Sequence, residues 1–287
     1  MITDKKVIES QINQVKKTMA SLLEDSQLAS FIPKNKNLLG SGKMLRSKLV
    51  QYLGSANGVE VQTLVHAGAA VDIIHAASLV HDDVIDGGLI RRGAPTFWHK
   101  HGTNGAILFG DLLMFRALAL LTESARTDLL EELINMTGEV CRSEAEQELI
   151  LRGDPGNWQE CLQIARFKTG SLFAFAAVAG SSGNAEEVIA LREAGFMLGT
   201  AYQLADDILD VSGNEAVSGK TLGRDAQRGK TTAMTSKQGA PDDPVAYLND
   251  LLQQAEDLVK PWPTTHQAWR QYMDEQITPV IKKFIQA

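Results

Sequence analysis

Two aspartate clusters of the same form stand out as groups that could do chemistry. The first is Asp82-Asp83-Val84-Ile85-Asp86, and the second is Asp206-Asp207-Ile208-Leu209-Asp210. Each cluster directly follows an apolar stretch with helical periodicity. In a helix, the first and last aspartates of a cluster lie one turn apart, and the second and last are also neighbours. Each helix is therefore predicted to present several carboxylates on one face.

Six carboxylates with no lysine among them favour a divalent cation. Oxygen ligands without His or Cys at bonding spacing favour Mg²⁺ over zinc, iron or copper, and a di-iron bundle would need Glu-x-x-His pairs that the sequence lacks. A solvated acidic helix end is the alternative, but aspartate at a helix C-terminus opposes the dipole by about 0.3–1 kcal/mol per charge, and the motif occurs twice. Because Mg²⁺ prefers a few carboxylates plus substrate phosphate, the clusters predict a diphosphate held between them.

Basic residues that could bind such phosphates occur in five short motifs. They are Gly42-Lys43-Met44-Leu45-Arg46 at a predicted helix N-terminus, Arg91-Arg92-Gly93, Lys168-Thr169-Gly170, Gly219-Lys220 and Gly229-Lys230-Thr231. For any one motif alone, a solvated surface charge is the better explanation, so their value is collective. The last two lie in the glycine-punctuated segment 213–231, whose spacing is one residue too long for an ATP-binding P-loop. We expect this segment to be a mobile basic flap.

The elements that must position these residues are helical. Apolar periodicity predicts helices over residues 4–25, 42–57, 61–86, 104–124, 127–150, 158–181, 185–212, 242–260 and 266–286. Alternating strand-like runs are scarce, and no Asn-Gly or Asp-Gly hairpin signal separates two of them. Small and apolar residues dominate 64–80 and 173–180, as is typical of helices at the centre of a large bundle. We predict one all-α domain, residues 1–287, a bundle of about nine or ten helices.

The composition excludes several classes of protein. Hydrophobic residues are 44% and charged residues 22%, which is ordinary for a globular chain, and the net charge of −7 disfavours nucleic-acid binding. Two cysteines make no disulfide framework. The first residues show no signal-peptide pattern, and Asp111 and Arg116 interrupt the longest apolar stretch. We therefore expect a cytoplasmic protein without stable membrane insertion.

Taken together, the motifs resemble those of the trans-isoprenyl diphosphate synthases, the polyprenyl synthetase family, of the medium- or long-chain or geranylgeranyl type. The resemblance covers about residues 40–231 and includes GKMLR, IHAASLVHDDVID, RRGAPT, FGD, KTG, YQLADDILD and GK…GRD…GKT, in the family's order. It implies an all-α homodimer with its active site in a bundle cavity. It also implies a Mg²⁺-dependent prenyltransferase, with about three ions per site, that condenses isopentenyl diphosphate with an allylic diphosphate into a linear all-trans polyprenyl diphosphate.

The resemblance also implies roles for individual residues. The Mg²⁺ ligands would be Asp82, Asp83, Asp86, Asp206, Asp207 and Asp210. The allylic diphosphate would be bound by Arg91, Lys168, Thr169, Gln203, Lys220 and Lys230, with Thr169 and Gln203 also facing the allylic cation. The isopentenyl diphosphate would be bound by Lys43, Arg46, His75 and Arg92. The sequence departs from the family's usual Gly-Gly-Lys-Arg-Leu-Arg-Pro at Ser41, Met44 and Ser47.

Two related functions remain as alternatives. A terpene cyclase of the same fold usually replaces one aspartate cluster and needs no site for isopentenyl diphosphate. A non-catalytic subunit of a heteromeric prenyl synthase would normally have lost part of a cluster. Both clusters and the three residues Lys43, Arg46 and His75 are present here. The sequence therefore favours the synthase over both alternatives.

Product length is indicated by the residues that precede the first cluster. Ser78 and Ala77 lie four and five residues before Asp82, about 5.4 Å along the helix, and Ile74 lies a turn further. Because both nearer residues are small, we expect an open tunnel and a product of at least about twenty carbons. The alternative is a tunnel floor supplied by the next helix, from Met114, Phe115 or Leu118.

Overall fold

The computed structural model describes most of the chain. The described residues are 4–22, 24, 39–40, 42–124, 126–151, 153, 156–212, 233, 236 and 238–286. The flap expected over 213–231, with Lys220 and Lys230, lies outside them.

Helices make up nearly all of the regular structure. They are α1 (Lys5–Ser21), α2 (Leu45–Ala56), α3 (Val61–Ile85), α4 (Phe97–Thr122), α5 (Thr127–Leu149), α6 (Trp158–Ala165), α7 (Ser171–Ala179), α8 (Ala185–Ser212), α11 (Pro244–Val259), α12 (Pro263–Tyr272) and α13 (Thr278–Ile285). The π-helical segments η3 (Arg166–Gly170) and η4 (Met273–Ile277) join α6 to α7 and α12 to α13. The short strands β1 (Ile90–Arg91) and β2 (Ala94–Pro95) form a hairpin between α3 and α4. The predicted all-α class is confirmed.

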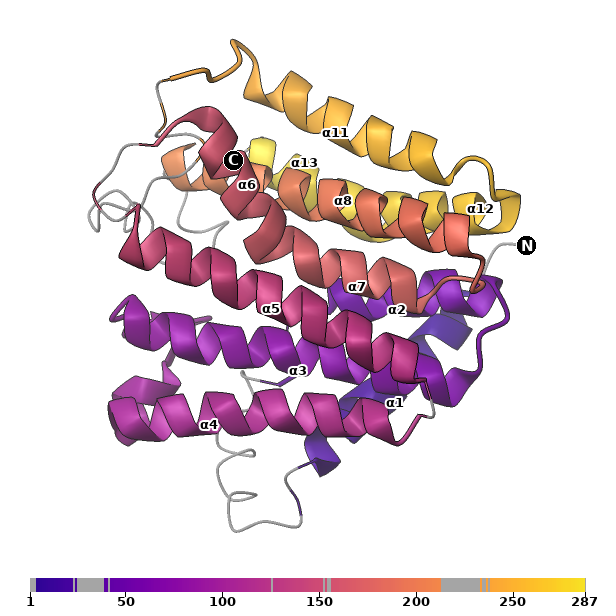
Figure 1. The fold of residues 1–287 in the computed structure, drawn as a ribbon, viewed down its shortest axis with the longest axis horizontal. Helices are drawn as coiled ribbons and strands as arrows, with labels where there is room; N and C mark the ends of the chain where they lie inside the picture. Colours follow the sequence, from indigo (N-terminus) through magenta and orange to yellow (C-terminus); the bar gives the residue numbers. More distant parts are fainter. Residues whose placement is uncertain are drawn as a thin grey trace.

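Helices α3 and α7 form the centre of the bundle. Helix α3 packs against α1, α2, α4 and α7, and α7 packs against α2, α5 and α8 (Figure 1). Helix α11 covers α8 on the side away from α3 (Figure 1). Every residue of α7 is buried, as are most residues of α3. Helices that are apolar around their whole circumference can be stable only inside a bundle, so the sequence had indicated these two correctly.

Glycines allow the backbone of the segment η3–α7 to contact the backbone of α8 directly. A Cβ atom on Gly199 would lie 2.4 Å from the Cα atom of Gly170, and one on Gly195 would lie 2.5 Å from the Cα atom of Ala174. Real side chains do not tolerate such distances, so both positions require glycine for packing. The close approach brings the residues of η3 next to the acidic end of α8.

Three predicted helices begin or continue differently in the structure. The helix expected over 158–181 is interrupted by η3, and the one expected over 266–286 begins at Pro263 and is interrupted by η4. Helix α4 begins at Phe97 rather than near 104, with a kink at Gly102, where φ is 79°. A π segment inserts about one residue into a helix without disturbing the apolar pattern around it, so periodicity does not reveal it.

The hairpin was also not predicted. Ile90 pairs with Pro95 and Arg91 with Ala94, and the two residues between them are Arg92 and Gly93. Their φ angles are 51° and 71°, which is the left-handed pair that a type I′ turn requires. Arginine is uncommon at positive φ. The turn therefore has the glycine of the usual Asn-Gly pair but not its asparagine, and the sequence did not indicate a hairpin.

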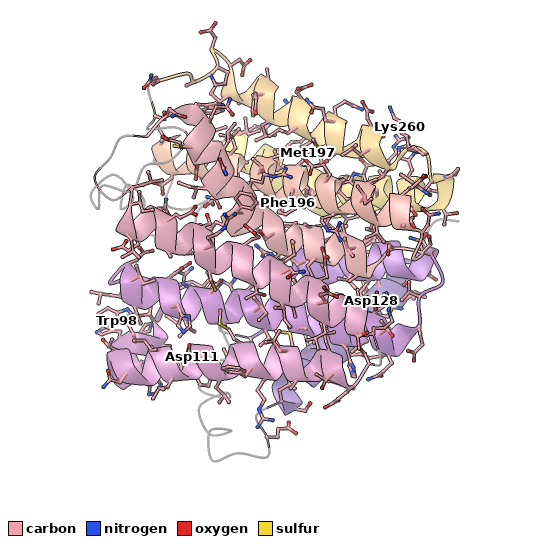
Figure 2. The ribbon with its side chains drawn as sticks, in the orientation of Figure 1. Trp98, Asp111, Asp128, Phe196, Met197 and Lys260 are labelled. Atoms are coloured by element: carbon pink, nitrogen blue, oxygen red, sulfur yellow. The ribbon has the colours of Figure 1, made fainter. Side chains whose placement is uncertain are left out.

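Helices α3 and α4 are long and apolar enough to cross a membrane by length and composition alone. The apolar window of α3 is 83% buried within the bundle, whereas that of α4 is only 39% buried. Helix α4 lies at the edge of the bundle, and Figure 2 labels Asp111 on it. Large apolar side chains on this helix are exposed, including Leu108 (68%) and Phe115 (71%). The outer face of α4 is thus an apolar surface that the described residues do not cover.

Candidate active site

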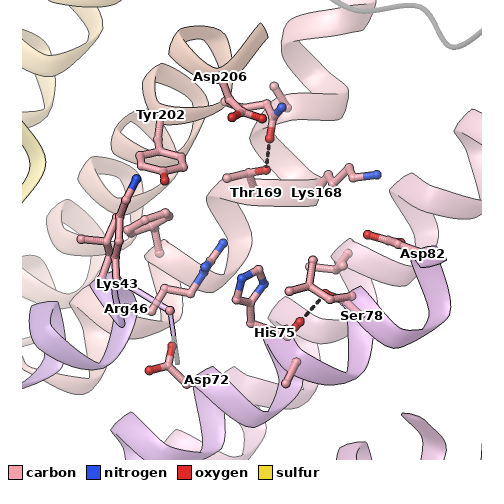
Figure 3. Close-up of a pocket in the computed structure, with 18 of the residues that line it drawn as sticks. Lys43, Arg46, Asp72, His75, Ser78, Asp82, Lys168, Thr169, Tyr202 and Asp206 are labelled. Atoms are coloured by element: carbon pink, nitrogen blue, oxygen red, sulfur yellow. Dashed lines mark hydrogen bonds between the residues drawn. The ribbon is translucent and has the colours of Figure 1, made fainter. Parts of the chain in front are cut away.

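A cavity of about 690 Å³ lies inside the bundle. Its walls come from the N-terminal end of α2, the C-terminal half of α3, the β hairpin, α5, the α6–η3 segment, α7, α8 and α13 (Figure 3). Its volume is within the range of small-molecule sites, about 300–1,000 Å³. Of the predicted site residues, those that line it are Lys43, Arg46, His75, Ser78, Asp82, Asp86, Arg91, Arg92, Lys168, Thr169, Gln203, Asp206 and Asp207.

Two pairs of aspartates face the cavity from opposite helices. Asp82 and Asp86 come from the end of α3, and Asp206 and Asp207 come from α8. Figure 3 shows Asp82 and Asp206 on two different helices, with Lys168 and Thr169 between them. Asp82 and Asp86 are four residues apart and share one face of α3, as the spacing predicted, whereas Asp206 and Asp207 are adjacent in the sequence and the spacing did not pair them. The remaining two aspartates of the motifs do not line the cavity.

One of these two, Asp83, binds the hairpin instead. Its side chain is 9% exposed and accepts hydrogen bonds from Arg91 Nε at 3.0 Å and Arg91 Nη2 at 2.9 Å. Burial raises the pKa of Asp83, while the bonds from Arg91 oppose that shift. This bidentate pair fixes Arg91 at the edge of the cavity. Asp210, the other, is half-buried at the far end of its cluster.

The donor set fits magnesium bound together with a substrate. Among the residues that the structure describes, no three acidic, His or Cys side chains converge to hold a metal ion by themselves. The four aspartates at the cavity offer only hard oxygen ligands, divided between two helices. Mg²⁺ commonly takes one or two carboxylates, several waters and substrate phosphates, so it does not require a closed protein cage. Asp82, Asp86, Asp206 and Asp207 are the residues that could hold it.

Lys168 reaches into the cavity from η3 toward the first aspartate pair (Figure 3). Its ammonium group forms an ion pair with Glu144 on α5, which also lines the cavity. Burial works to lower the pKa of Lys168, but the charges of Asp82, Glu144 and Asp86 outweigh it and raise the pKa above its usual value. Lys168 is therefore a permanent cation at this position. π-helical segments often occur at functional sites because they reorient one or two side chains.

Thr169 and Gln203 connect η3 to the second aspartate pair. The Thr169 hydroxyl donates to Gln203 Oε1 at 2.7 Å (dashed line at Thr169 in Figure 3). Gln203 Nε2 in turn donates to Asp207 Oδ1 at 2.9 Å. The contact depends on the close packing of Gly170 against Gly199 described above. Because the hydroxyl proton points toward Gln203, the lone pairs of the Thr169 oxygen are left for the cavity side.

A second group of cations lies at the other end of the cavity. Lys43 and Arg46 come from the start of α2, where the N-cap residue Met44 has a left-handed backbone with φ 50°. Burial lowers the pKa of Arg46 but leaves a guanidinium that is charged at all working pH values. The pKa of His75 lies well below its usual value because of burial and the nearby arginines, so its imidazole is neutral.

Asp72 is a buried carboxyl group that the sequence analysis did not single out. It lines the cavity from α3, one helical turn below His75 (Figure 3). Burial raises its pKa to about 6, while a hydrogen bond from Ser47 and the charge of Arg46 oppose the shift. A charged residue between Val71 and Ile73, in an otherwise apolar helix, was the signal that could have identified it. Glu144 and Phe284, which also line the cavity, carried no such signal.

The predicted chain-length residues separate in the structure. Ser78 lines the cavity, and its hydroxyl donates to the carbonyl of His75 at 2.9 Å. Ala77 and Ile74 are fully buried in the core and are not among the residues that line the cavity. On a helix, residue i−4 from Asp82 shares its face and residue i−5 does not, which explains the difference.

Comparisons with known proteins agree with this geometry. The family model for polyprenyl synthetase matches residues 32–261. Geranylgeranyl diphosphate synthase of Mycobacterium tuberculosis is 33% identical over 84% of this chain and 74% of its own length. Farnesyl diphosphate synthase of Escherichia coli K12 is 36% identical over 68% of this chain and 70% of its own length. Four further relatives are matched over 60–64% of their own length.

A solved structure has the same fold over nearly the whole chain. The polyprenyl synthase of Caulobacter crescentus CB15, complexed with calcium and isoprenyl diphosphate, superposes with a TM-score of 0.83 at 27% identity and covers 94% of both chains. The family match, the two facing aspartate pairs and the cations around one cavity point to the same conclusion. The chain belongs to the polyprenyl synthetase family and is a prenyltransferase of isoprenoid biosynthesis.

Proposed function

We propose that this enzyme joins isopentenyl diphosphate to an allylic diphosphate, head to tail, and releases a linear all-trans polyprenyl diphosphate. The observation that carries the proposal is that two sets of charged groups, each suited to a diphosphate, line one cavity. Asp82 and Asp206 mark the first set, and Lys43 and Arg46 mark the second. A condensation of two diphosphates needs two such sets, whereas cyclisation of one diphosphate needs only the first.

The allylic diphosphate would bind at the aspartate end. About three Mg²⁺ ions, when bound by the aspartates there, would supply Lewis-acid stabilisation of the departing diphosphate. Lys168 and Arg91 provide fixed positive charges beside it, each already oriented by a carboxylate. Donors and charges fixed before reaction stabilise developing negative charge at little reorganisation cost. Lys220 and Lys230, outside the described residues, are proposed to add to this set.

The chemistry would proceed between the two phosphate sites. The bond between C1 of the allylic group and the diphosphate oxygen breaks, and the oxygen of Thr169 faces the resulting allylic cation. The double bond of isopentenyl diphosphate attacks C1 and forms the new carbon–carbon bond. A proton then leaves C2 of the isopentenyl unit to the departed diphosphate. Apolar residues of the cavity wall, such as Leu79 and Val140, exclude water that would otherwise trap the cation.

The isopentenyl diphosphate would bind at the opposite end, between Lys43, Arg46, His75 and Arg92. His75 contributes a neutral imidazole that can donate one hydrogen bond to a phosphate oxygen. The N-terminal end of α2 adds the positive end of its dipole beside Lys43 and Arg46.

We propose a product of at least about twenty carbons. Two small residues of α3, Ala76 and Ser78, line the cavity within two turns of Asp82, and Leu79 lines it beside them. The small residues leave room for a prenyl chain at that depth, which is the observation that supports this length. Relatives with different named products, geranylgeranyl and farnesyl diphosphate, are about equally similar to this chain. Overall sequence similarity therefore does not determine the length of the product, and the residues of the cavity wall must determine it.

We also propose a homodimer that buries the outer face of α4. Leu108 and Phe115 lie seven residues apart on one side of this helix and are 68% and 71% exposed. An apolar patch of this kind marks an interface. Asp111 lies between these two residues on α4, and its carboxylate is 3.3 Å from His81 Nε2. A face that includes a carboxylate suits a protein partner better than lipid. Sedimentation of the wild type and of Phe115→Asp tests this, since the variant should shift the dimer toward monomer.

The proposed location is the cytoplasm. Cys141 and Cys161 are both free thiols, and burial raises the pKa of Cys161 to about 11. Such thiols suit a reducing compartment. Fractionation of cells that produce the protein tests the location.

One experiment tests the proposed reaction directly. The purified protein is incubated with Mg²⁺, isopentenyl diphosphate and allylic primers of increasing length, and product length is measured by chromatography. We expect product only when both diphosphates and Mg²⁺ are present. A hydrocarbon formed from the allylic diphosphate alone would indicate a cyclase, and no turnover by the pure chain would indicate a subunit that needs a partner.

A further inference from the structure

The cations around the cavity are held in two different ways. At the aspartate end, each cation is paired with a carboxylate. Arg91 donates to Asp83, and Lys168 pairs with Glu144. These partners fix the cations but also neutralise much of their charge.

At the isopentenyl end, the two cations of the α2 segment rest on aromatic rings. Lys43 Nζ lies 4.6 Å from the ring centre of Phe284, and Arg46 Cζ lies 4.8 Å from the ring centre of Phe173. Both distances are within the limit for a cation–π interaction, about 6 Å. In the part of the chain that the structure describes, neither cation forms an ion pair.

The two rings belong to one aromatic row that crosses three helices. Phe284 on α13 contacts Tyr202 on α8 with ring centres 5.8 Å apart, and Tyr202 contacts Phe173 on α7 at 5.9 Å. Both contacts are tilted rather than parallel, which aromatic pairs prefer. All three rings line the cavity, and we call them the aromatic row.

An aromatic face holds a cation without occupying its hydrogen-bond donors. A carboxylate would use the N–H groups that a diphosphate needs, whereas a ring uses only the charge. Arg46 Nε is a buried donor with no hydrogen-bond acceptor among the described residues. Asp72 lies near Arg46 but forms no ion pair with it within those residues. The arrangement keeps donors available on the side of the cavity.

The C-terminal helices hold the backbone of α2 in the same region. The Tyr272 hydroxyl donates to the carbonyl of Leu45 at 3.0 Å, and Lys48 Nζ donates to Gln276 Oε1 at 2.8 Å. Phe284 follows on α13, directly beside Lys43. The C-terminal segment is thus in contact with both the backbone and a side chain of the isopentenyl site.

We propose that the aromatic row positions Lys43 and Arg46 for a diphosphate, and that Phe284 thereby makes the C-terminal helix a determinant of affinity for isopentenyl diphosphate. The inference rests on the proposed function for the identity of the ligand. Phe284 and its neighbours act as positioning residues, since their effect passes through the two cations. Loss of the Phe284 ring should therefore weaken the binding of isopentenyl diphosphate and leave that of the allylic diphosphate unchanged. Lys168 and Arg91, at the allylic end, are held by carboxylates and not by the aromatic row.

The test replaces the ring and then restores it. Phe284→Leu keeps the residue apolar but removes the π face, and Phe284→Tyr keeps the face. Titration calorimetry with isopentenyl diphosphate alone, which is not consumed without a primer, measures affinity directly. We expect Phe284→Leu to weaken binding roughly three- to thirty-fold and Phe284→Tyr to retain most of it. In steady-state assays, KM for isopentenyl diphosphate should rise while KM for the allylic diphosphate stays near its wild-type value.

Ile281→Ala is the matched control, because Ile281 is a buried residue of the same helix that does not line the cavity. It should lower the melting temperature without changing affinity for isopentenyl diphosphate. Unchanged affinity in Phe284→Leu would overturn the inference, and so would an equal loss in Ile281→Ala or in the KM of both substrates. Failure of the wild type to form product would instead contradict the proposed reaction, and the calorimetric comparison would still decide the role of Phe284.

Discussion

Arg91 donates hydrogen bonds from Nε and Nη2 to the carboxylate of Asp83, at 2.9 to 3.0 Å. This contact divides the first aspartate cluster into two roles. Asp82 and Asp86 face the cavity, whereas Asp83 ties the end of α3 to the β hairpin. The three aspartates look equivalent in the sequence, but the helix turns the middle one away from the site.

Asp83→Asn should therefore lower stability more than it lowers the affinity for metal. Loss of a charge-assisted bidentate contact at a largely buried position is expected to cost about 1–3 kcal/mol in the free energy of unfolding. Urea denaturation measures this, and a double-mutant cycle with Arg91→Gln should be clearly non-additive. A stable Asp83→Asn protein with the same Mg²⁺ dependence defect as Asp82→Asn would show that Asp83 is a ligand after all.

Asp82→Asn and Asp206→Asn should each cut turnover by several powers of ten with little change in melting temperature. Each removes a hard oxygen ligand from one side of the cavity, and an amide is a much poorer ligand for Mg²⁺. Turnover is measured over a range of Mg²⁺ concentrations, with exposed Asp250→Asn as the control for loss of one negative charge. Near-wild-type activity in either cavity variant would contradict the two-sided arrangement.

Glu144→Gln should change binding and stability in opposite directions. Glu144 pairs with Lys168, so a diphosphate must compete with this carboxylate for the ammonium group. Removing the charge should lower KM for the allylic diphosphate, while the half-buried Lys168 left without its partner should lower the melting temperature. Exposed Glu131→Gln on the same helix is the control. A raised KM would mean that Glu144 orients Lys168 rather than competes for it.

Much of this architecture could be read from residue spacing. Helix periodicity located α3, α5 and α8 to within a few residues, and the i, i+4 spacing placed Asp82 and Asp86 together. The sequence did not predict local structure that depends on a single residue, or contacts with residues distant in the chain. The π turn around Lys168 leaves the apolar pattern intact, and the hairpin turn has Arg92 where Asn is usual. Sequence spacing cannot reveal contacts across the fold.

The same limit explains the partners of the predicted basic residues. Lys168 and Glu144 are close in space only because η3 packs against α5. Lys43 and Phe284 come from opposite ends of the chain. Residue types near in sequence indicated that a phosphate site exists, but the tertiary fold decides which cations are neutralised and which remain available.

Stability should depend on pH through Asp72. Burial raises its pKa to about 6 from 3.8, against the opposing effects of Ser47, Arg46 and Arg92. The folded protein therefore binds this proton more tightly than the unfolded chain. The resulting stabilisation is complete below pH 3.8 and is lost as the pH rises through about 6. The full change is expected to be roughly 3 kcal/mol.

Asp72→Asn imitates the protonated form and cannot titrate. Its free energy of unfolding relative to the wild type should rise between pH 4 and pH 7, when measured by urea denaturation at each pH. Exposed Asp274→Asn serves as the control and should show no such trend. A difference between wild type and Asp72→Asn that is constant over this range would mean that Asp72 is ionised throughout.

Product length should respond to Ser78 but not to Ala77. Ser78 lines the cavity on the same face of α3 as Asp82, whereas Ala77 is fully buried in the core on another face. Ser78→Phe should place a ring one turn below the metal-binding aspartates and shorten the product without preventing the first condensation. Ala77→Phe should overpack the core, lower stability by about 1–3 kcal/mol and leave the product lengths unchanged. Chromatography of the products and thermal denaturation of both variants measure the two effects. If Ala77→Phe shortens the product and Ser78→Phe does not, the prenyl chain follows a path through the core that this cavity does not include.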